Sequence, residues 1–181
     1  MANVRKNIVL IGFMGAGKTL ISKQLALALG RERVSTDELI EKRERRAITE
    51  IFEKQGEPAF RELEESVIEK IADKEGLVID CGGGIPLSEN NMSRLKEKGI
   101  IIYLQAKPGV VFRRIKHMTH RPLLKQYNTE SKIAELMKSR IPHYEKADFT
   151  VDSNSDNIEQ TTKSILRLIT GDRTGSFTSF K

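Results

Sequence analysis

Short continuous apolar runs alternate along this 181-residue chain with longer segments whose apolar residues have helical spacing. The runs at residues 8–11, 77–81 and 100–104 have strand length and lack the apolar–polar alternation of a half-exposed strand. Such runs are typical of parallel strands that are buried on both faces. Two shorter strand patterns lie at residues 33–36 and 148–152. The sequence therefore predicts about five strands.

Between these runs the three- and four-residue spacing of apolar positions predicts amphipathic helices. The predicted helices cover residues 20–29, 37–46, 48–54, 59–74, 88–98, 110–116, 129–146 and 156–168. Gly56 and Pro58 separate two of them, and Pro142 is expected to end or kink another. Strands that alternate with helices predict one α/β domain over residues 1–169, with a parallel sheet covered on both faces. The Gly/Ser/Thr-rich tail at 170–181 is expected to be mobile.

The segment Gly12–Thr19, GFMGAGKT, fits the phosphate-binding pattern G-x-x-x-x-G-K-[ST] and lies between a predicted strand and a predicted helix. Glycines let the backbone turn so that successive N–H groups and the helix N-terminus point at one anion. Lys18 would reach the β- and γ-phosphates of a nucleotide, and the hydroxyl of Thr19 would bind the bridging Mg²⁺. The alternative is a chance match in a glycine-rich turn.

The composition changes this interpretation little. The formal net charge is +6, which suits an anionic ligand without separating a nucleotide from a nucleic acid. Charges of both signs are interleaved and no basic cluster carries aromatic residues, so no nucleic-acid partner is expected. The single cysteine, Cys81, excludes an internal disulfide framework, and its apolar neighbours favour an inert, buried thiol. No segment has signal or membrane-spanning character, so we expect a cytoplasmic protein, with a monomer as the default.

Seven short motifs occur in a fixed order along most of the chain. They are residues 11–19, 36–37 with 40–41, 50–52, 56–64, 82–84, 121–124, and 140–144 with 147–148. Together they resemble the shikimate kinase family, from the phosphate loop to about residue 152. The resemblance implies a three-layer P-loop fold like that of nucleoside monophosphate kinases. It also implies that the γ-phosphoryl group of MgATP is transferred to the 3-hydroxyl of shikimate.

The resemblance implies roles for three charged residues in a substrate-binding helical segment at about 37–64 and in a later helix. Arg61 and Arg140 match the family's carboxylate-binding arginines, and fixed guanidinium groups suit a carboxylate ligand. Asp37 matches the aspartate that accepts hydrogen bonds from the reacting hydroxyl, and it could receive the proton of that hydroxyl. Glu64, on the same helix face as Arg61, is expected to orient it. From the residues alone, Asp37 could instead be a helix N-cap and both arginines exposed helical cations.

Three consecutive glycines follow the strand that is predicted at residues 77–81. Gly82, Gly83 and Gly84 imply a backbone that something must approach closely, because the absence of a Cβ gives room as well as conformational freedom. In the family they would bring N–H groups to the substrate and the γ-phosphate. The alternative is a turn that needs unusual torsions.

The resemblance also assigns a nucleotide site. Its expected members are Gly12, Gly15, Ala16, Gly17, Lys18, Thr19, Leu20, Arg114, Arg121 and Asn157. Arg114 is a candidate for stacking near adenine, with the turn at 153–157 on the other side. The segment at about 117–127 resembles the family's lid, whose arginine, here Arg121, would reach the transferring phosphates while closure excludes water.

Two positions depart from the family pattern. Ser35 stands where the family usually has an aspartate that holds Mg²⁺ through water, and Asp80 stands where a small or hydroxyl residue is common. We hypothesise that the carboxylate has moved to Asp80, which would then share the metal site with Thr19. The alternative is that Asp80 pairs with Lys18 or another cation and has no metal role.

Two other functions stay open at this stage. A related small-molecule kinase of the gluconate or nucleoside type would share the sheet and the phosphate loop. The three glycines and the pair Arg61 and Arg140 suit a carboxylated polyol better than a nucleobase. A nucleotide-dependent binding module, including a family member that Ser35 has weakened catalytically, is the alternative from another class.

Overall fold

A parallel five-stranded sheet forms the centre of the molecule in a computed structural model, which describes residues 6–116 and 129–171. The strands are β1 (Asn7–Ile11), β2 (Arg33–Ser35), β3 (Val78–Asp80), β4 (Gly99–Gln105) and β5 (Phe149–Asp152). They lie in the order β2-β3-β1-β4-β5, and every neighbouring pair is parallel. The predicted parallel sheet of five strands is confirmed.

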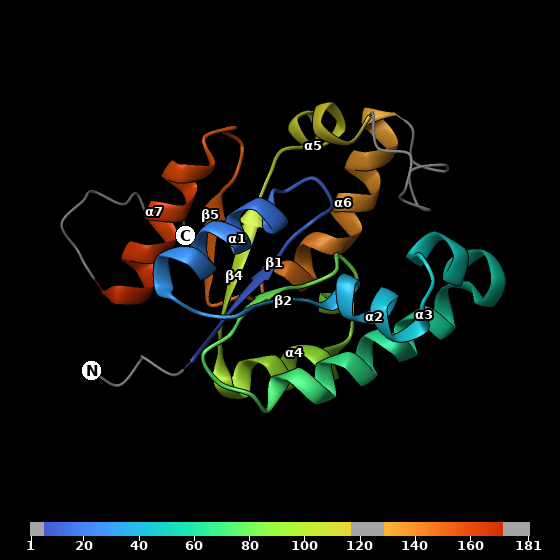
Figure 1. The fold of residues 1–181 in the computed structure, drawn as a ribbon. Helices are drawn as coiled ribbons and strands as arrows, with labels where there is room; N and C mark the ends of the chain where they lie inside the picture. Colours follow the sequence, from blue (N-terminus) through green and yellow to red (C-terminus); the bar gives the residue numbers. More distant parts are fainter. Residues whose placement is uncertain (1–5, 117–128, 172–181) are drawn as a thin grey trace.

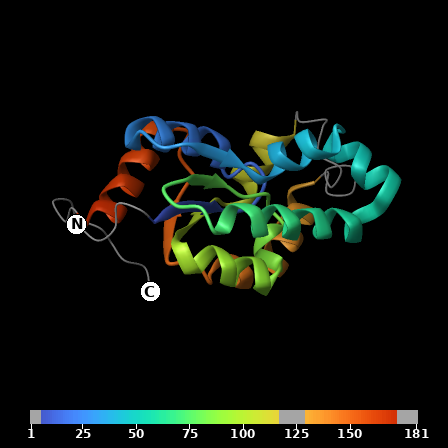
Figure 2. The ribbon, with the colours of Figure 1, turned by 60° about the horizontal axis from the view of Figure 1, so that its bottom comes forward.

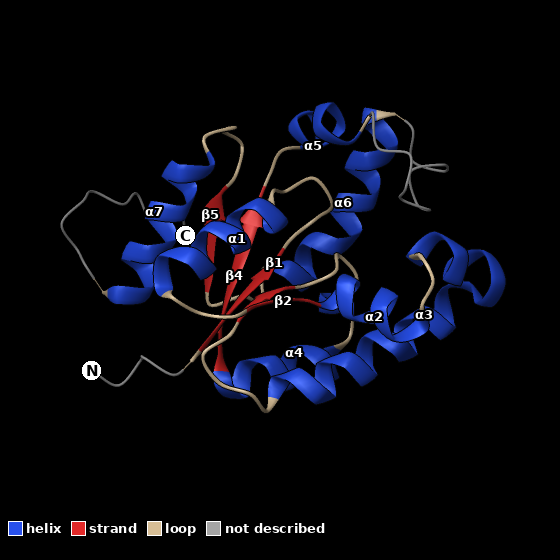
Figure 3. Cartoon of the chain, in the orientation of Figure 1, coloured by secondary structure: helices blue, strands red, loops and turns tan. Residues whose placement is uncertain are grey.

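Helices cover both faces of this sheet, which gives three layers (Figures 1 and 2). They are α1 (Lys18–Leu29), α2 (Thr36–Glu44), α3 (Ile48–Ala72), α4 (Glu89–Lys98), α5 (Pro108–Ile115), α6 (Glu130–Tyr144) and α7 (Ile158–Thr170), with a short 3-10 helix η1 at Ile85–Leu87. α1 and α7 pack together on one face, and α3 packs against α4 on the other. The coloured cartoon in Figure 3 shows the strands enclosed between the helices.

The central strands explain why their sequences show no alternation. All five residues of β1 are buried, and six of the seven residues of β4, Gly99 to Leu104, are buried. A strand covered by helices on both faces has no solvent side on which a polar residue would be favoured. The continuous apolar runs therefore report the buried parallel sheet.

The α2–α3 region projects from the sheet and contains the predicted substrate-binding segment (Figure 1, right). Separate helices were predicted at 48–54 and 59–74, and α3 consists of two helical arms that meet at a kink at Gly56. Gly56 interrupts its helical geometry with φ 82° and ψ 176°, torsions that glycine adopts without Cβ strain. Pro58 follows at the start of the second arm, where a missing N–H is tolerated. The prediction of two helices separated at Gly56 is therefore confirmed.

The other helices end within about two residues of their predicted bounds, and one short element was not predicted. η1 was not predicted, because a three-residue turn carries no periodicity. α6 passes through Pro142 and ends two residues later at Tyr144 rather than at Lys146. α7 begins at Ile158, two residues after the predicted start, because Asn157 is its N-cap.

Some expectations fall outside the described residues. They concern the predicted lid at 117–127 with Arg121, and residues 172–181 of the predicted tail. In the part of the chain that is described, no helix is both long enough and apolar enough to span a membrane.

Candidate active site

A cavity of about 720 Å³ lies beside the residues that follow the carboxyl ends of β1, β2 and β3. Its walls come from the phosphate loop, the α2–α3 region, the glycine loop at 82–84, and single residues of α5, α6 and α7. In a parallel sheet the carboxyl ends of the strands point to one edge, so segments distant in sequence meet there. The site is therefore assembled by the sheet topology.

The phosphate loop is held in its curve by three glycines with positive φ. Gly12 has φ 147°, Gly15 has φ 76° and Gly17 has φ 89°. A Cβ on Gly12 would stand 2.7 Å from the carbonyl oxygen of Leu104, and one on Gly15 would stand 2.7 Å from Cγ2 of Ile115. The torsions require glycine at all three positions, and close packing adds to this requirement at Gly12 and Gly15.

Lys18 begins α1 and folds back over the loop. Its Nζ donates to the carbonyl oxygens of Gly12 at 2.8 Å and Phe13 at 3.0 Å. Thr19 and Leu20 follow as exposed residues that line the cavity. The ammonium group and the N-terminus of α1 therefore face the cavity with the positive character that phosphate binding needs. Gly12 and the fully buried Ala16 shape the loop without lining the cavity.

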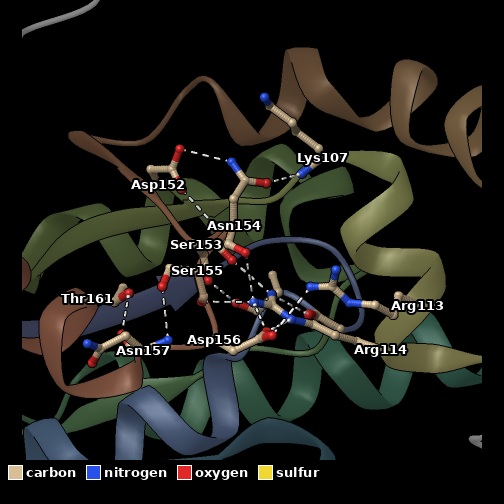
Figure 4. Close-up of polar contacts among 12 residues, drawn as sticks. Lys107, Arg113, Arg114, Asp152, Ser153, Asn154, Ser155, Asp156, Asn157 and Thr161 are labelled. Atoms are coloured by element: carbon tan, nitrogen blue, oxygen red, sulfur yellow. Dashed lines mark hydrogen bonds and ion pairs between the residues drawn. The ribbon is translucent and has the colours of Figure 1, made fainter.

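Arg114, on α5, is fixed by contacts from every side of its guanidinium group (Figure 4). Nε and Nη2 donate to Oδ1 of Asp156 at 3.1 and 2.9 Å. Nη1 donates to the carbonyls of Gly15 and Ser153, and Nη2 also donates to that of Ser155. All the in-plane donors are thereby used inside the protein. What remains for a ligand is the flat face of the group, which suits stacking on a planar ring.

Asn157, which was predicted to bind the nucleotide, is the N-cap of α7. Its side chain accepts a hydrogen bond from the backbone N–H of Gln160 at 3.0 Å and caps α7. It does not line the cavity, whereas its neighbours Asp156 and Ile158 do. The turn at 153–157 therefore lines the cavity through Asp156, and Ile158 lines it from the start of α7.

Arg61, on the second arm of α3, is held between two carboxylates. It forms an ion pair with Glu57 on its outer side, and its Nη1 lies 2.6 Å from Oε2 of Glu64 on its inner side. The predicted orientation of Arg61 by Glu64 is confirmed. The Glu64 side chain is only 2 % exposed. Burial, together with the charge of Asp37, raises the pKa of this carboxyl to about 7 against the opposing effect of Arg61.

The glycine loop lies directly against these charged side chains. A Cβ on Gly82 would overlap Oδ1 of Asp37, and a Cβ on Gly84 would overlap the guanidinium group of Arg61. The N–H of Gly82 also donates to Oγ1 of Thr36 at 2.8 Å. The close approach that the three glycines imply is confirmed at Gly82 and Gly84, and the approaching groups belong to the protein itself.

Arg140, on α6, also lines the cavity. It is 6 % exposed, and its guanidinium carbon lies 5.6 Å from the centre of the Phe13 ring. One turn later, Tyr144 donates its hydroxyl to the carbonyl of Gly83 at 2.9 Å. The alternative that Arg140 is an exposed helical cation is therefore wrong, since it is buried beside the phosphate loop and the glycine loop.

Ser35 and Asp80 occupy paired positions at the ends of adjacent strands. They are Cα partners in the β2–β3 ladder, as expected from the family fold. The Ser35 hydroxyl accepts from the backbone N–H of Glu38 at 3.4 Å and caps α2. Asp37 lies within the first turn of that helix, so the alternative that it is the N-cap is wrong.

Asp80 has a cationic partner that sequence reasoning missed. Its Oδ2 lies 2.9 Å from Nη2 of Arg33 and 3.5 Å from the hydroxyl of Ser22. The partner is Arg33, so the pairing of Asp80 with another cation is confirmed, and the metal role of Asp80 stays a prediction. Arg33 and Asp80 are 47 residues apart, and no local pattern signals their contact.

Another missed residue secures the phosphate loop. Ser153 donates its buried hydroxyl to the carbonyl of Ala16 at 2.6 Å, across 137 residues of sequence. Together with Arg114, which donates to the carbonyl of Gly15, Ser153 connects the turn at 153–157 to the phosphate loop. A serine in a turn gives no sequence signal for this role.

The residues present fit Mg²⁺. The hydroxyl of Thr19 and the carboxylate of Asp80 line the same cavity. Mg²⁺ prefers oxygen ligands, keeps several waters and takes the remaining ligands from substrate phosphates, so it needs few protein groups. The described residues hold no group of three or more His, Cys, Asp or Glu side chains that could bind a metal ion.

The fold and the site define a P-loop phosphotransferase that acts on a small molecule. The phosphate loop at the N-terminus of α1 and the charged pocket of Asp37, Arg61 and Arg140 open into one cavity. The family model described as shikimate kinase matches residues 14–170, and the chain belongs to this family.

Relatives of the same family are similar to this protein over almost the whole chain. A shikimate kinase from Thermodesulfovibrio yellowstonii is 48% identical over 90% of this chain and 94% of its own length. Another from Caldanaerobacter subterraneus is 41% identical over 90% and 95%. Among solved structures, the shikimate kinase from Acinetobacter baumannii in complex with shikimate has a TM-score of 0.89 and 36% identity, with 96% of this chain and 97% of that chain covered. A gluconokinase from Sinorhizobium meliloti, at 16% identity and TM-score 0.59 over 93% and 96%, shares the fold alone.

Proposed function

We propose that this protein transfers the γ-phosphoryl group of ATP to the 3-hydroxyl of shikimate and so produces shikimate 3-phosphate and ADP for aromatic amino-acid biosynthesis. The observation that carries this proposal is a single cavity lined both by the phosphate loop and by Asp37, Arg61 and Arg140. Membership of the shikimate kinase family supports the assignment. The relative from Acinetobacter baumannii, whose structure was solved in complex with shikimate, supports shikimate as the acceptor.

The charged pocket provides for the acceptor. Arg61 and Arg140 offer guanidinium groups to the carboxylate of shikimate, because such groups bind carboxylates with planar, charge-assisted hydrogen bonds. Asp37 accepts hydrogen bonds from the hydroxyls, orients the reacting one and receives its proton. The backbone N–H groups of the glycine loop reach the substrate, because Gly82, Gly83 and Gly84 have no side chains that would stand in between.

The phosphate loop provides for the nucleotide. Lys18 binds the β- and γ-phosphates, and Gly15, Gly17 and the N-terminus of α1 offer N–H groups. Arg114 presents its flat face to adenine. Mg²⁺, held by Thr19 and through water by Asp80, would neutralise charge on the phosphates. Oδ2 of Asp80 already binds Arg33, so we assign the metal-bound waters to its other oxygen.

The wider organisation is proposed on the same basis. Residues 1–169 act as one kinase domain, with acceptor binding at about 37–64 and a lid at about 117–127 that brings Arg121 to the phosphates. The protein is proposed to act as a cytoplasmic monomer without a nucleic-acid or membrane partner. Sedimentation of the purified protein tests the oligomeric state, and DNA affinity that falls steeply with salt would contradict the proposal on nucleic acid.

ADP release from MgATP tests the function. The assay compares shikimate with gluconate, a nucleoside and no acceptor. Shikimate-dependent release is expected in the wild type, with loss in Lys18→Ala and retention in Lys23→Ala, an exposed lysine of the same helix. Release that is independent of shikimate, or its absence from the wild type, would contradict the proposal.

A further inference from the structure

The Glu64 carboxylate is the one buried acidic group of the acceptor pocket whose bonding is incomplete among the described residues. Its Oε2 accepts from Arg61, but its Oε1 is buried and has no hydrogen-bond partner there. Glu64 also lines the cavity. A buried carboxylate oxygen without a donor is costly, so it calls for a donor or a proton.

The surroundings of Glu64 set the charge balance. The groups that face it are Arg61 from its own helix, Asp37 from α2, Arg140 and Tyr144 from α6, and the thiol of Cys81 after β3. Burial raises the pKa of both the tyrosine and the cysteine, so these two stay neutral. Two carboxylates therefore share the pocket with two guanidinium groups, and Glu57 adds an exposed carboxylate on the outer side of Arg61.

The carboxylates of Asp37 and Glu64 flank one point of the glycine loop. A Cβ on Gly82 would overlap Oδ1 of Asp37 and would lie 3.1 Å from Oε1 of Glu64. A like charge this close disfavours ionisation of the less solvated carboxyl, which therefore holds a proton more readily. Glu64, at 1 % exposure, is that group.

Shikimate would bring a third carboxylate into this balance. If its carboxylate binds Arg61 and Arg140, as the proposed function requires, the arginines no longer offset the charges of Asp37 and Glu64 fully. One added negative charge next to a buried carboxylate raises its proton affinity. The pKa of Glu64 in the free protein, at about 7, already leaves a large ionised fraction available for protonation at neutral pH.

We propose that shikimate binds together with a proton that Glu64 takes up from solvent, and that this proton keeps the charge of Glu64 from repelling the carboxylate of shikimate. The inference rests on the proposed function and deepens it. Glu64 acts here as a positioning residue: no bond of shikimate changes in this step. Acceptor binding should weaken as pH rises through neutrality, because the ionised form must first gain a proton.

Calorimetric titration of the full-length protein with shikimate at pH 7, without nucleotide, tests the proposal. The same titration in phosphate, imidazole and Tris buffers gives the number of protons taken up, because each buffer releases its proton with a different enthalpy. The wild type is expected to take up about half a proton per bound shikimate, since a group near its pKa is about half ionised. Glu64→Gln should bring the uptake close to zero. Glu57→Gln, which removes the exposed partner of Arg61, should retain it.

The outcomes separate the two proposals. Heats that saturate but do not depend on the buffer would overturn proton uptake and leave shikimate binding intact. Uptake that persists in Glu64→Gln would assign the proton to another group and overturn the inference. The absence of saturable heat in the wild type would overturn the proposed function, and the inference with it.

Infrared difference spectra of the wild type provide a test that needs no variant. Protein labelled with ¹³C at its glutamate side-chain carboxyls should gain the C=O band of a protonated, ¹³C-shifted carboxyl when shikimate is added. An unlabelled sample gives the same band without the shift and serves as the control. A spectrum that gains no such band contradicts the inference even if Glu64→Gln fails to fold.

Discussion

Oδ2 of Asp80 lies 2.9 Å from Nη2 of Arg33, and both side chains are largely buried at the edge of the sheet that faces the phosphate loop. Arg33 also binds the hydroxyl of Ser22 on α1 through Nε and the carboxylate of Glu38 on α2 through Nη1. One arginine thus joins the first helix, the Asp80 carboxylate and the helix that carries Asp37. This contact compensates the burial of Asp80, whose other oxygen is the one proposed to hold waters on Mg²⁺.

Asp80→Asn is expected to raise the Mg²⁺ concentration that gives half-maximal kinase activity. The neutral amide keeps an oxygen for Arg33 but removes the negative charge from the outer shell of the metal. Ser35→Asp in the Asp80→Asn background should restore part of the Mg²⁺ affinity, because the two positions are partners across β2 and β3. Mg²⁺ titrations of the activity, together with Mg²⁺-dependent binding of ADP by calorimetry, measure both effects.

The Arg33 contact makes a stability control necessary for this experiment. Loss of the charged partner of a buried arginine costs roughly 1–3 kcal/mol, so urea unfolding of each variant separates stability from metal binding. Equal Mg²⁺ requirements in the wild type and in folded Asp80→Asn would leave Asp80 with a structural role alone.

Arg61→Lys and Arg140→Lys are each expected to raise the KM for shikimate about tenfold to a hundredfold. The positive charge stays, but the planar pair of donors that matches a carboxylate is lost, and hydrogen bonds to charged groups contribute about 1.5–3 kcal/mol. The KM for ATP should change little. Arg94→Lys, an exposed arginine paired with Glu69, is the matched control. If all three variants gave the same small change, the two pocket arginines would not bind the acceptor carboxylate.

The sequence predicts those parts of the fold that one segment determines by itself. Strands buried on both faces leave continuous apolar runs, so all five were found within about two residues of their bounds. The 3-10 helix at Ile85–Leu87 leaves no period and was not predicted, whereas Gly56 and Pro58 mark the kink between the two arms of α3. Local pattern therefore predicts elements that have a period or a breaker residue, and it misses a single turn.

The site shows the same division between residue and contact. The glycine loops and the charged residues of the pocket stand out in the sequence, since their types and spacing carry the chemistry. Their partners do not: Arg33 meets Asp80 and Ser153 meets Ala16 only because the sheet order brings distant segments together. Glu64 was predicted as a partner of Arg61, but burial raises its pKa and leaves Oε1 without a partner among the described residues, which spacing does not reveal.

Asp156→Ala is expected to raise the KM for ATP a few-fold and to leave the KM for shikimate unchanged. Asp156 accepts from two donors of Arg114 (Figure 4), and its removal lets the guanidinium plane turn away from the adenine position. The effect is small because Asp156 is exposed and the backbone carbonyls still hold Arg114. Steady-state kinetics with each substrate varied in turn measure it.

Glu159→Ala is the control for this variant. It removes an exposed carboxylate that pairs with Lys163 in the first turns of α7, close to Asp156 in sequence. A rise in the KM for ATP that was as large in Glu159→Ala would trace the effect to the general charge of this region and not to Arg114.

The pH dependence of stability provides a separate test of Glu64. Its pKa rises from 4.5, the ordinary value of a glutamate, to about 7 in the folded protein. Between these values the folded state holds a proton that the unfolded chain has released, so the free energy of unfolding falls as pH increases through this window. Over this pH window the free energy of unfolding falls by roughly 3 kcal/mol, at about 1.36 kcal/mol per pKa unit.

Glu64→Gln removes this titration and keeps an oxygen for Arg61. The variant should therefore gain stability relative to the wild type by roughly 3 kcal/mol between pH 4.5 and 8. Urea unfolding of both proteins across this range gives the difference between their free energies of unfolding. Groups that titrate in the same way in both proteins do not contribute to this difference. Glu69→Gln, on the exposed part of the same helix, measures the effect of losing a glutamate charge in general. A wild-type-to-Glu64→Gln difference that stays constant with pH would mean that Glu64 is already ionised at pH 5 in the folded protein, and that Arg61 outweighs burial.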